Sequence, residues 1–215
     1  YTLHTFSTAG TSQFTIDGAA AGPKLSGGLS GTGGFTWNST STLTLTGANI
    51  YQGDTIISAG TLQAGDGGAS GSLGSGAITN NAALVIDRSN DYSISAAISG
   101  TGRLTKLGAG TLTLSGINTY SGLTTISAGR LIGSAASLPG AIANAAELEF
   151  AQPSAGTFSS AITGAGSLTK TGGGNLILSG SSAYSGATSV AAGRLSVDGI
   201  LGDSPIAVLA AAELG

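Results

Sequence analysis

The chain has 215 residues, of which 38 are Gly, about 18% and more than twice the usual share of ~7%. Only 8% of the residues are charged and 40% are hydrophobic, which excludes a solvated charged tail and intrinsic disorder. The net charge is -3 with no cluster of Lys or Arg, so we expect no nucleic-acid partner. Without Cys, the chain has no disulfides and no thiolate metal sites. No run of apolar residues approaches the ~18 of a membrane span.

An internal repeat dominates the sequence. Residues 29–62, 98–131 and 162–195 align without gaps, with 19 of 34 positions identical between the first two copies and 20 of 34 between the last two. The spacer after the first copy is longer than the spacer after the second. The chain begins and ends inside weaker copies of the spacer, so we expect residues 1–215 to be a single segment of a longer array.

Each copy predicts short strands separated by turns. The first strand places Leu at every second position and stops at Gly, as in TLTLTG at 42–47, TLTLSG at 111–116 and NLILSG at 175–180. Gly residues flanking Asn or Ser then predict a turn, as in GINTYSG at 116–122. A second short strand, at 55–58 in the first copy, is broken by Ala-Gly, and a third begins at Leu62. No stretch has the period of a helix.

The repetition favours a solenoid over a sandwich or a barrel. A triangular coil of three short strands needs roughly 20 to 25 residues, so one period of the repeat predicts about three coils. The whole chain then has roughly nine or ten coils. Parallel stacking explains the composition, because Leu, Ile, Val and Ala form inward columns while Gly, Asn and Ser occupy the corners.

The second copy, GTGRLTKLGAGTLTLSGINTYSGLTTISAGRL, resembles the autotransporter-associated β-strand repeat, also called the passenger-associated transport repeat. The resemblance implies an all-β, right-handed parallel β-helix that a Gram-negative bacterium exports through its outer membrane. In this family such a helix is usually the extracellular or cell-surface shaft of an adhesin or of another virulence or aggregation factor. The third copy departs from the pattern at Asn175 and Ser182, and the first at Trp37 and Gln52. We interpret these four positions as corners and surface.

The sequence offers weak candidates for catalysis. The chain has one histidine, His4, so a Ser-His-Asp triad would depend on it alone. Glu147 and Glu149 have the spacing of a carboxylate pair on one strand face, as in a polysaccharide-cleaving β-helix. We interpret both as an outward polar face opposite Leu148 and Phe150. We therefore expect no catalytic residues.

Acidic turns give equally weak candidates for metal ligands. Asp87, Ser89 and Asp91 alternate in DRSND, but the following Gly and distal Glu of a calcium loop are missing. GDGG at 65–68 and DGILGD at 198–203 lack the repeated calcium pattern as well. Turn chemistry explains all three segments, so we expect no metal and no cofactor.

Two sets of equivalent residues invite interpretation. Lys106 and Lys170 align with Trp37, which suggests a rim position where the stem lies along the coil and the tip reaches water. Tyr51, Tyr120 and Tyr184 align at a corner, and we expect them on one edge of the rod. A structural role there is more plausible than stacking on a sugar.

The leading interpretation is a non-enzymatic shaft of an autotransporter-like adhesin. A self-assembling extracellular fibre and a carbohydrate-active β-helix remain as alternatives. Because neither end of the segment has the charge, proline or helix of a cap, we expect end-to-end self-association. A host or glycan surface ligand is the other partner that this interpretation leaves open.

Overall fold

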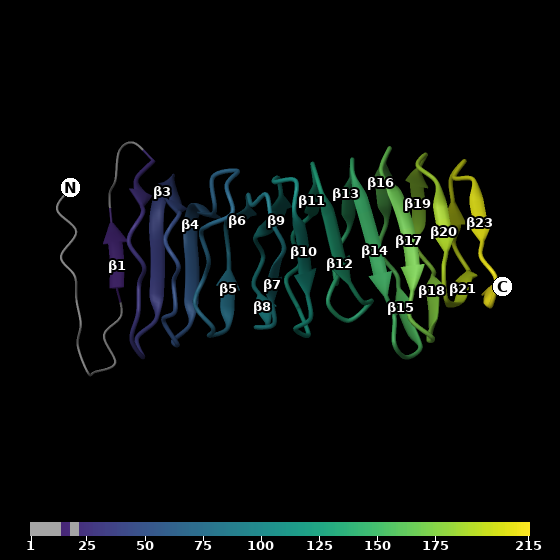
Figure 1. Cartoon of the computed structure of the whole chain (residues 1–215), viewed down its shortest axis with the longest axis horizontal. Helices are drawn as coiled ribbons and strands as arrows, with labels where there is room; N and C mark the ends of the chain where they lie inside the picture. Colours follow the sequence, from purple (N-terminus) through teal and green to yellow (C-terminus); the bar gives the residue numbers. More distant parts are fainter. Residues whose placement is uncertain (1–13, 18–21) are drawn as a thin grey trace.

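The structure, a computed structural model, describes residues 14–17 and 22–215. These residues form strands and turns and contain no helix. The chain winds into a rod whose strands lie across its long axis (Figure 1). Every strand pair between coils is parallel, for example Leu112 with Leu131. The expected all-β parallel solenoid is therefore confirmed.

The coil has three sides, which we call faces A, B and C. Face A carries β2, the second halves of β3 and β4, and seven later strands: β2 (Lys24–Leu25), β3 (Phe35–Leu45), β4 (Thr55–Ala64), β6 (Ala83–Ile86), β9 (Arg103–Lys106), β11 (Thr124–Ile126), β13 (Ile142–Asn144), β16 (Ile162–Gly164), β19 (Ser181–Tyr184) and β22 (Ile200–Leu201). Face B follows face A in each coil and carries β7 (Tyr92–Ile94), β10 (Thr111–Leu114), β12 (Arg130–Gly133), β14 (Glu147–Ala151), β17 (Ser167–Thr171), β20 (Thr188–Val190) and β23 (Ile206–Val208).

Face C lies between face B of one coil and face A of the next. Towards the N-terminal end it carries β1 (Phe14–Asp17), the first halves of β3 and β4, β5 (Ile78–Asn80) and β8 (Ile98–Ser99). Towards the C-terminal end it carries β15 (Gly156–Phe158), β18 (Asn175–Leu178), β21 (Gly193–Val197) and β24 (Ala212–Leu214). β3 and β4 turn the corner from face C to face A without a break, with register shifts between Trp37 and Thr42.

Coils of similar length stack equivalent apolar side chains into columns. On face A, Leu43, Leu62, Leu84 and Leu104 come from four successive coils and pair in register. On face B, Leu112, Leu131, Leu148 and Leu168 form the equivalent column. All eight Leu side chains are at most 1% exposed. The longest path through the sheets joins ten strands, one from each successive coil, which agrees with the expected nine or ten coils.

Each repeat spans three coils and one further face. From Leu43 the chain passes Leu62, Leu84 and Leu104 on face A before it reaches the equivalent Leu112, which lies on face B. From Leu112 it again makes three coils on face B before Leu176, which lies on face C. The estimate of about three coils was therefore short by one face. Equivalent residues of the three copies lie on three different sides of the rod.

The alternation within these strands generates the first test. Leu112 is fully buried and Leu114 is 2% exposed, whereas Thr113 between them points outward and is half-buried. Replacing Leu112 by Asp should cost several kcal/mol, because the carboxylate would be buried without a partner. Thr113→Asp should cost less than about 1 kcal/mol. Urea denaturation of both variants checks this, and equal losses of stability would contradict the inward assignment of Leu112.

Candidate functional site

The lysines of the second and third copies lie inside the rod, where they join one coil to the next. Lys170 is fully buried, and its Nζ donates to the carbonyl oxygens of Thr171, Gly172 and Ala192 at 2.7–2.9 Å. Lys106 is 1% exposed and donates to the equivalent carbonyls of Gly108 and Ala128. The expected rim position with a wet tip was wrong. The carbonyl oxygens of two tight corners replace the water that the ammonium group would need.

Trp37 fills the same position in the first copy with a smaller set of bonds. Its Nε1 donates to the carbonyl oxygen of Ser41 at 3.2 Å, within its own coil. Trp37 is fully buried, as is Lys170, so it lies inside the corner and not at the surface. A large apolar ring and an ammonium group are thus alternative solutions at one corner, because both fill space and donate to a backbone carbonyl.

The glycine of the Ala-Gly pair that follows the second predicted strand of each copy packs against the backbone of this corner. Gly60, Gly129 and Gly193 have φ of 62°, 67° and 66°, a conformation that side chains with a Cβ rarely adopt. A Cβ on Gly193 would lie 2.5 Å from the carbonyl oxygen of Gly172, which accepts the Lys170 bond. The glycine is required so that the two corners can approach closely enough for Lys170 to span them.

The aligned tyrosines are buried and bind a threonine at a fixed position after them. Tyr51, Tyr120 and Tyr184 are at most 3% exposed, and their hydroxyl groups share a hydrogen bond with Thr55, Thr124 and Thr188 at 2.5–2.7 Å. They do not share one edge of the rod, because the copies are rotated by one face. The expected structural role is confirmed, and a sugar cannot stack on these rings.

A buried asparagine bridges three successive coils, a role that the sequence analysis missed. The Asn118 side chain accepts from the Ile98 N–H at 2.8 Å and donates to the Ser137 carbonyl at 2.7 Å. Asn49 makes the equivalent bonds in the first copy. Ser182 in the third copy is 2% exposed and keeps the bond from the Ile162 N–H. Our interpretation of Ser182 as a corner or surface position was therefore wrong.

The two glutamates on β14 do not form a pair of free carboxylates. Glu147 is exposed, whereas Glu149 is 7% exposed, forms an ion pair with Arg130 and accepts a hydrogen bond from the Thr171 hydroxyl. Both residues alternate with the inward Leu148 and Phe150. Arg130 and Thr171 come from the coils on either side, so Glu149 joins three successive coils.

The acidic turns serve as local caps. Asp91 accepts from the Thr111 N–H of the next coil at 3.2 Å, and Asp66 pairs with Lys24, which lowers the pKa of that carboxyl. Within residues 14–17 and 22–215, no three His, Cys, Asp or Glu side chains lie close enough to hold a metal ion. His4 lies outside the described residues.

Metal removal tests this assignment of the acidic turns. We expect EDTA to leave the melting temperature unchanged, because Asp87 and Asp91 do not converge with a third carboxylate. Differential scanning calorimetry with EDTA, and then with added calcium, measures the effect. A fall of several degrees that calcium restores would assign Asp87 and Asp91 to a calcium site.

The buried tyrosines give the rod a specific response to alkali. Burial raises the pKa of Tyr51, Tyr120 and Tyr184 above the ordinary value of 10.0, although the hydrogen bond to each threonine partly opposes the change. A pKa raised by folding means that the unfolded chain loses its protons first. The stability that depends on the neutral phenols is complete below pH 10 and declines as the pH rises above it.

Replacing Tyr51, Tyr120 and Tyr184 by Phe should therefore make unfolding less dependent on pH above 10. At pH 7 each Phe should cost about 1 kcal/mol, because the hydrogen bond between the tyrosine and threonine hydroxyl groups is lost. Urea denaturation from pH 7 to 11 measures both effects. An unchanged slope above pH 10 would show that these phenols do not control alkaline unfolding.

Similarity to known proteins agrees with this geometry. The model of the passenger-associated transport repeat matches residues 38–64, 104–132 and 168–197. The adhesin BmaC autotransporter of Brucella suis biovar 1 (strain 1330) is 41% identical over 191 residues, which cover 86% of this chain and 4% of that protein. The chain thus spans a small fraction of the relative's length. No solved structure matches the chain significantly. In the part of the chain that the structure describes, no helix could cross a membrane.

Proposed function

We propose that this chain, which carries three passenger-associated transport repeats and so belongs to the autotransporter passengers, is a non-enzymatic shaft segment of a cell-surface adhesin. One observation carries the proposal. The polar side chains that recur in the copies are buried. Lys170 and Asn118 bind neighbouring coils, and Tyr120 binds Thr124 within its own coil. The repeat therefore maintains the rod and leaves none of these groups for chemistry. The similarity to an adhesin autotransporter supports export to the surface of a Gram-negative cell.

Removing one repeat period from the parent protein tests the shaft. Deleting residues 98–161 joins Ala97 to Ile162, which is the equivalent of Ile98. Ile162 can then take the place of Ile98 beside Ile78, and Leu168 the place of Leu104 beside Leu84. Because each coil finds an apolar partner, we expect export and surface display to be unchanged and the rod to be shorter by three coils and one face.

The measurements are surface labelling of whole cells and adhesion to a host-cell layer. A matched deletion of residues 98–151 removes less than a whole period, so it breaks the register of the columns and should reduce display. If the 98–161 deletion abolished adhesion while display stayed normal, the deleted coils would be adhesive and would not serve as a spacer. Turnover of any polysaccharide by the purified chain would favour the enzyme alternative.

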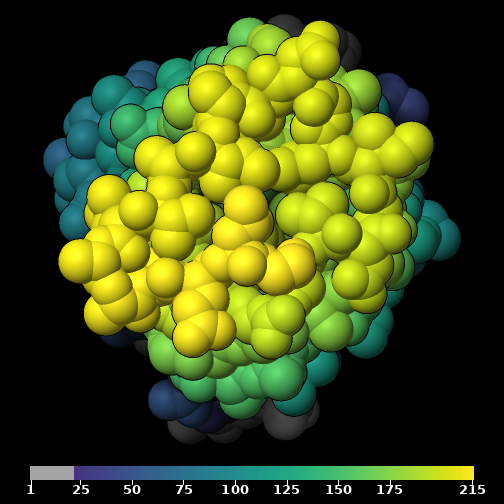
Figure 2. Space-filling view, turned by 90° about the vertical axis from the view of Figure 1, so that its right-hand side faces the viewer, coloured from purple at the N-terminus to yellow at the C-terminus, as the bar shows by residue number. Residues whose placement is uncertain are grey.

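The isolated chain has an exposed apolar surface at its C-terminal end. Ile206, Val208 and Leu214 are 39–50% exposed, and their strands β23 and β24 each pair with a coil on one side only. Figure 2 shows the last residues spread over most of this end. In a longer shaft a further coil would cover the same surface, whereas in the isolated chain a second copy can do so. This surface is the observation that favours the fibre alternative.

We therefore expect the isolated chain to associate end to end, with its sides inert. Small-angle scattering over a concentration series should show particles that grow in length at constant cross-section. Val208→Lys should reduce the association, because it places a charge on the unpaired edge. A chain that stays monomeric at millimolar concentration, or that grows in cross-section, would contradict this expectation.

A further inference from the structure

The spacers of the first and second copies differ in length at one place. The chain has five more residues between Leu62 and Ile78 than between the equivalent Leu131 and Ile142. Four of these additional residues precede Leu73, in the segment that contains Gly65–Gly71. A shaft needs no such insertion, because the shorter spacer closes the same coil. The insertion is thus a departure from the repeat that the shaft itself does not explain.

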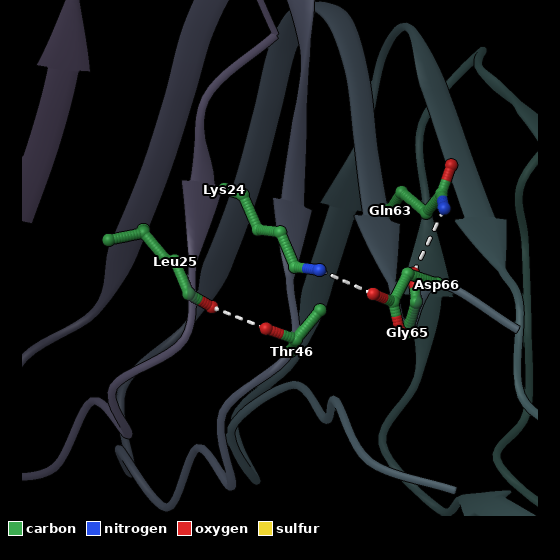
Figure 3. Close-up of polar contacts among 6 residues, drawn as sticks. All are labelled: Lys24, Leu25, Thr46, Gln63, Gly65 and Asp66. Atoms are coloured by element: carbon green, nitrogen blue, oxygen red, sulfur yellow. Dashed lines mark hydrogen bonds and ion pairs between the residues drawn. The ribbon is translucent and has the colours of Figure 1, made fainter. Parts of the chain in front are cut away.

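Specific contacts hold the inserted loop in place. The Arg88 guanidinium donates to the carbonyl oxygens of Gly71 and Ala69, the latter at 2.8 Å. Asp66, the second residue of the loop, pairs with Lys24 at 2.5 Å, reaching across the coil that carries Thr46 (Figure 3). Gln63 donates to the Gly65 carbonyl at the base of the loop (Figure 3). Contacts from several coils therefore fix its shape.

A groove of about 390 Å³ lies beside this loop, within the roughly 300–1,000 Å³ that ligand sites occupy. Three successive coils contribute to it: Ile50 and Gln52 from the first, Leu73–Ser75 from the second, and the segment 92–96 around β7 from the third. Arg88 links the groove to the loop, because its guanidinium also lies 4.7 Å from the centre of the Tyr92 ring.

The side chains that line the groove are uncharged. Gln52, Ser75, Ser93 and Ser95 are exposed and supply amide and hydroxyl groups, each of which both donates and accepts hydrogen bonds. Ile50 is 71% exposed and adds an apolar surface at the rim. A ligand with many hydroxyl groups, an apolar face and no charge complements this lining, and a neutral oligosaccharide has these properties.

An extended peptide fits the groove less well. A peptide that adds to a sheet edge binds through backbone hydrogen bonds. Here the Leu73 N–H already donates to the Tyr92 hydroxyl at 2.8 Å, and the Ser75 N–H donates to the Tyr51 carbonyl at 2.9 Å. The floor of the groove therefore lacks two of the donors that strand addition would use, so recognition passes through side chains.

We propose that this groove binds a neutral oligosaccharide, an inference that rests on the proposed adhesin function and names its ligand class. Arg88 holds the inserted loop and packs on Tyr92, which lines the groove, and Gln52, Ser75, Ser93 and Ser95 bind the sugar hydroxyls. The site occurs at the first spacer, where the five additional residues are present. The equivalent spacer of the second copy is closed by the shorter connection.

Isothermal titration of the purified chain with neutral di- to tetrasaccharides, and with sialylated and sulfated counterparts, tests the proposal. We expect binding of a neutral glycan, and at least a tenfold loss of affinity in Ser93→Trp, which fills the groove. Ser189→Trp places the same side chain on face B far from the groove and should bind normally. Gln52→Ala should weaken binding, whereas Ser121→Ala, at the equivalent position of the second copy, should not.

Circular dichroism establishes that each variant is folded, and Gln52→Ala keeps the test valid if Ser93→Trp does not fold. The proposal is overturned if no neutral glycan binds, if Ser93→Trp and Gln52→Ala both bind normally, or if only acidic glycans or peptides bind. Whole cells separate this inference from the shaft. Failure of the groove leaves surface display and the tolerance of the 98–161 deletion intact, whereas failure of the shaft function alters them.

Discussion

Parallel pairing of each coil with its two neighbours sets the conditions for the rest of this structure. A coil can pair along all three faces only if it returns to the same place after each turn, so equivalent positions of successive coils must share size and polarity. The columns of Leu on faces A and B satisfy this condition. The described residues contain no helix that could cover an unpaired sheet. The strands of each coil are therefore covered only by the strands of neighbouring coils.

The same constraint determines where polar groups are buried. A corner turns the backbone away from the sheet and leaves carbonyl oxygens and N–H groups without strand partners. Lys106, Lys170 and Asn118 supply those partners from inside the rod. Desolvation lowers the pKa of Lys106 and of Lys170, so each ammonium group depends on the carbonyl oxygens around it. Burying these groups thus completes the hydrogen bonding of the corners, and the hydrophobic columns supply the rest of the stability.

The sequence predicted the features that recur at every second residue or once in every copy. Alternation identified Leu112 and Leu114 as inward, and self-similarity identified the solenoid and its length. The polar interior was missed because hydropathy assigns Lys170, Asn118 and Ser182 to the surface. Their burial depends on backbone groups of the neighbouring coils, which are distant in sequence, so no local pattern reveals it. One signal was available. Lys and Trp occupy equivalent positions, and a Trp side chain such as Trp37 is unfavourable in water, so the position is not purely solvated.

The candidate groove could not be predicted from the sequence either, since its lining depends on which coils become neighbours. The unequal spacing of the copies indicated only where in the chain it lies.

The rotation of the repeat by one face has a consequence for the surface of the rod. Substitutions that spread by duplication of a whole repeat do not accumulate along one side, since successive copies point towards the three sides of the coil in turn. A surface property encoded in the repeat is therefore presented around the full circumference.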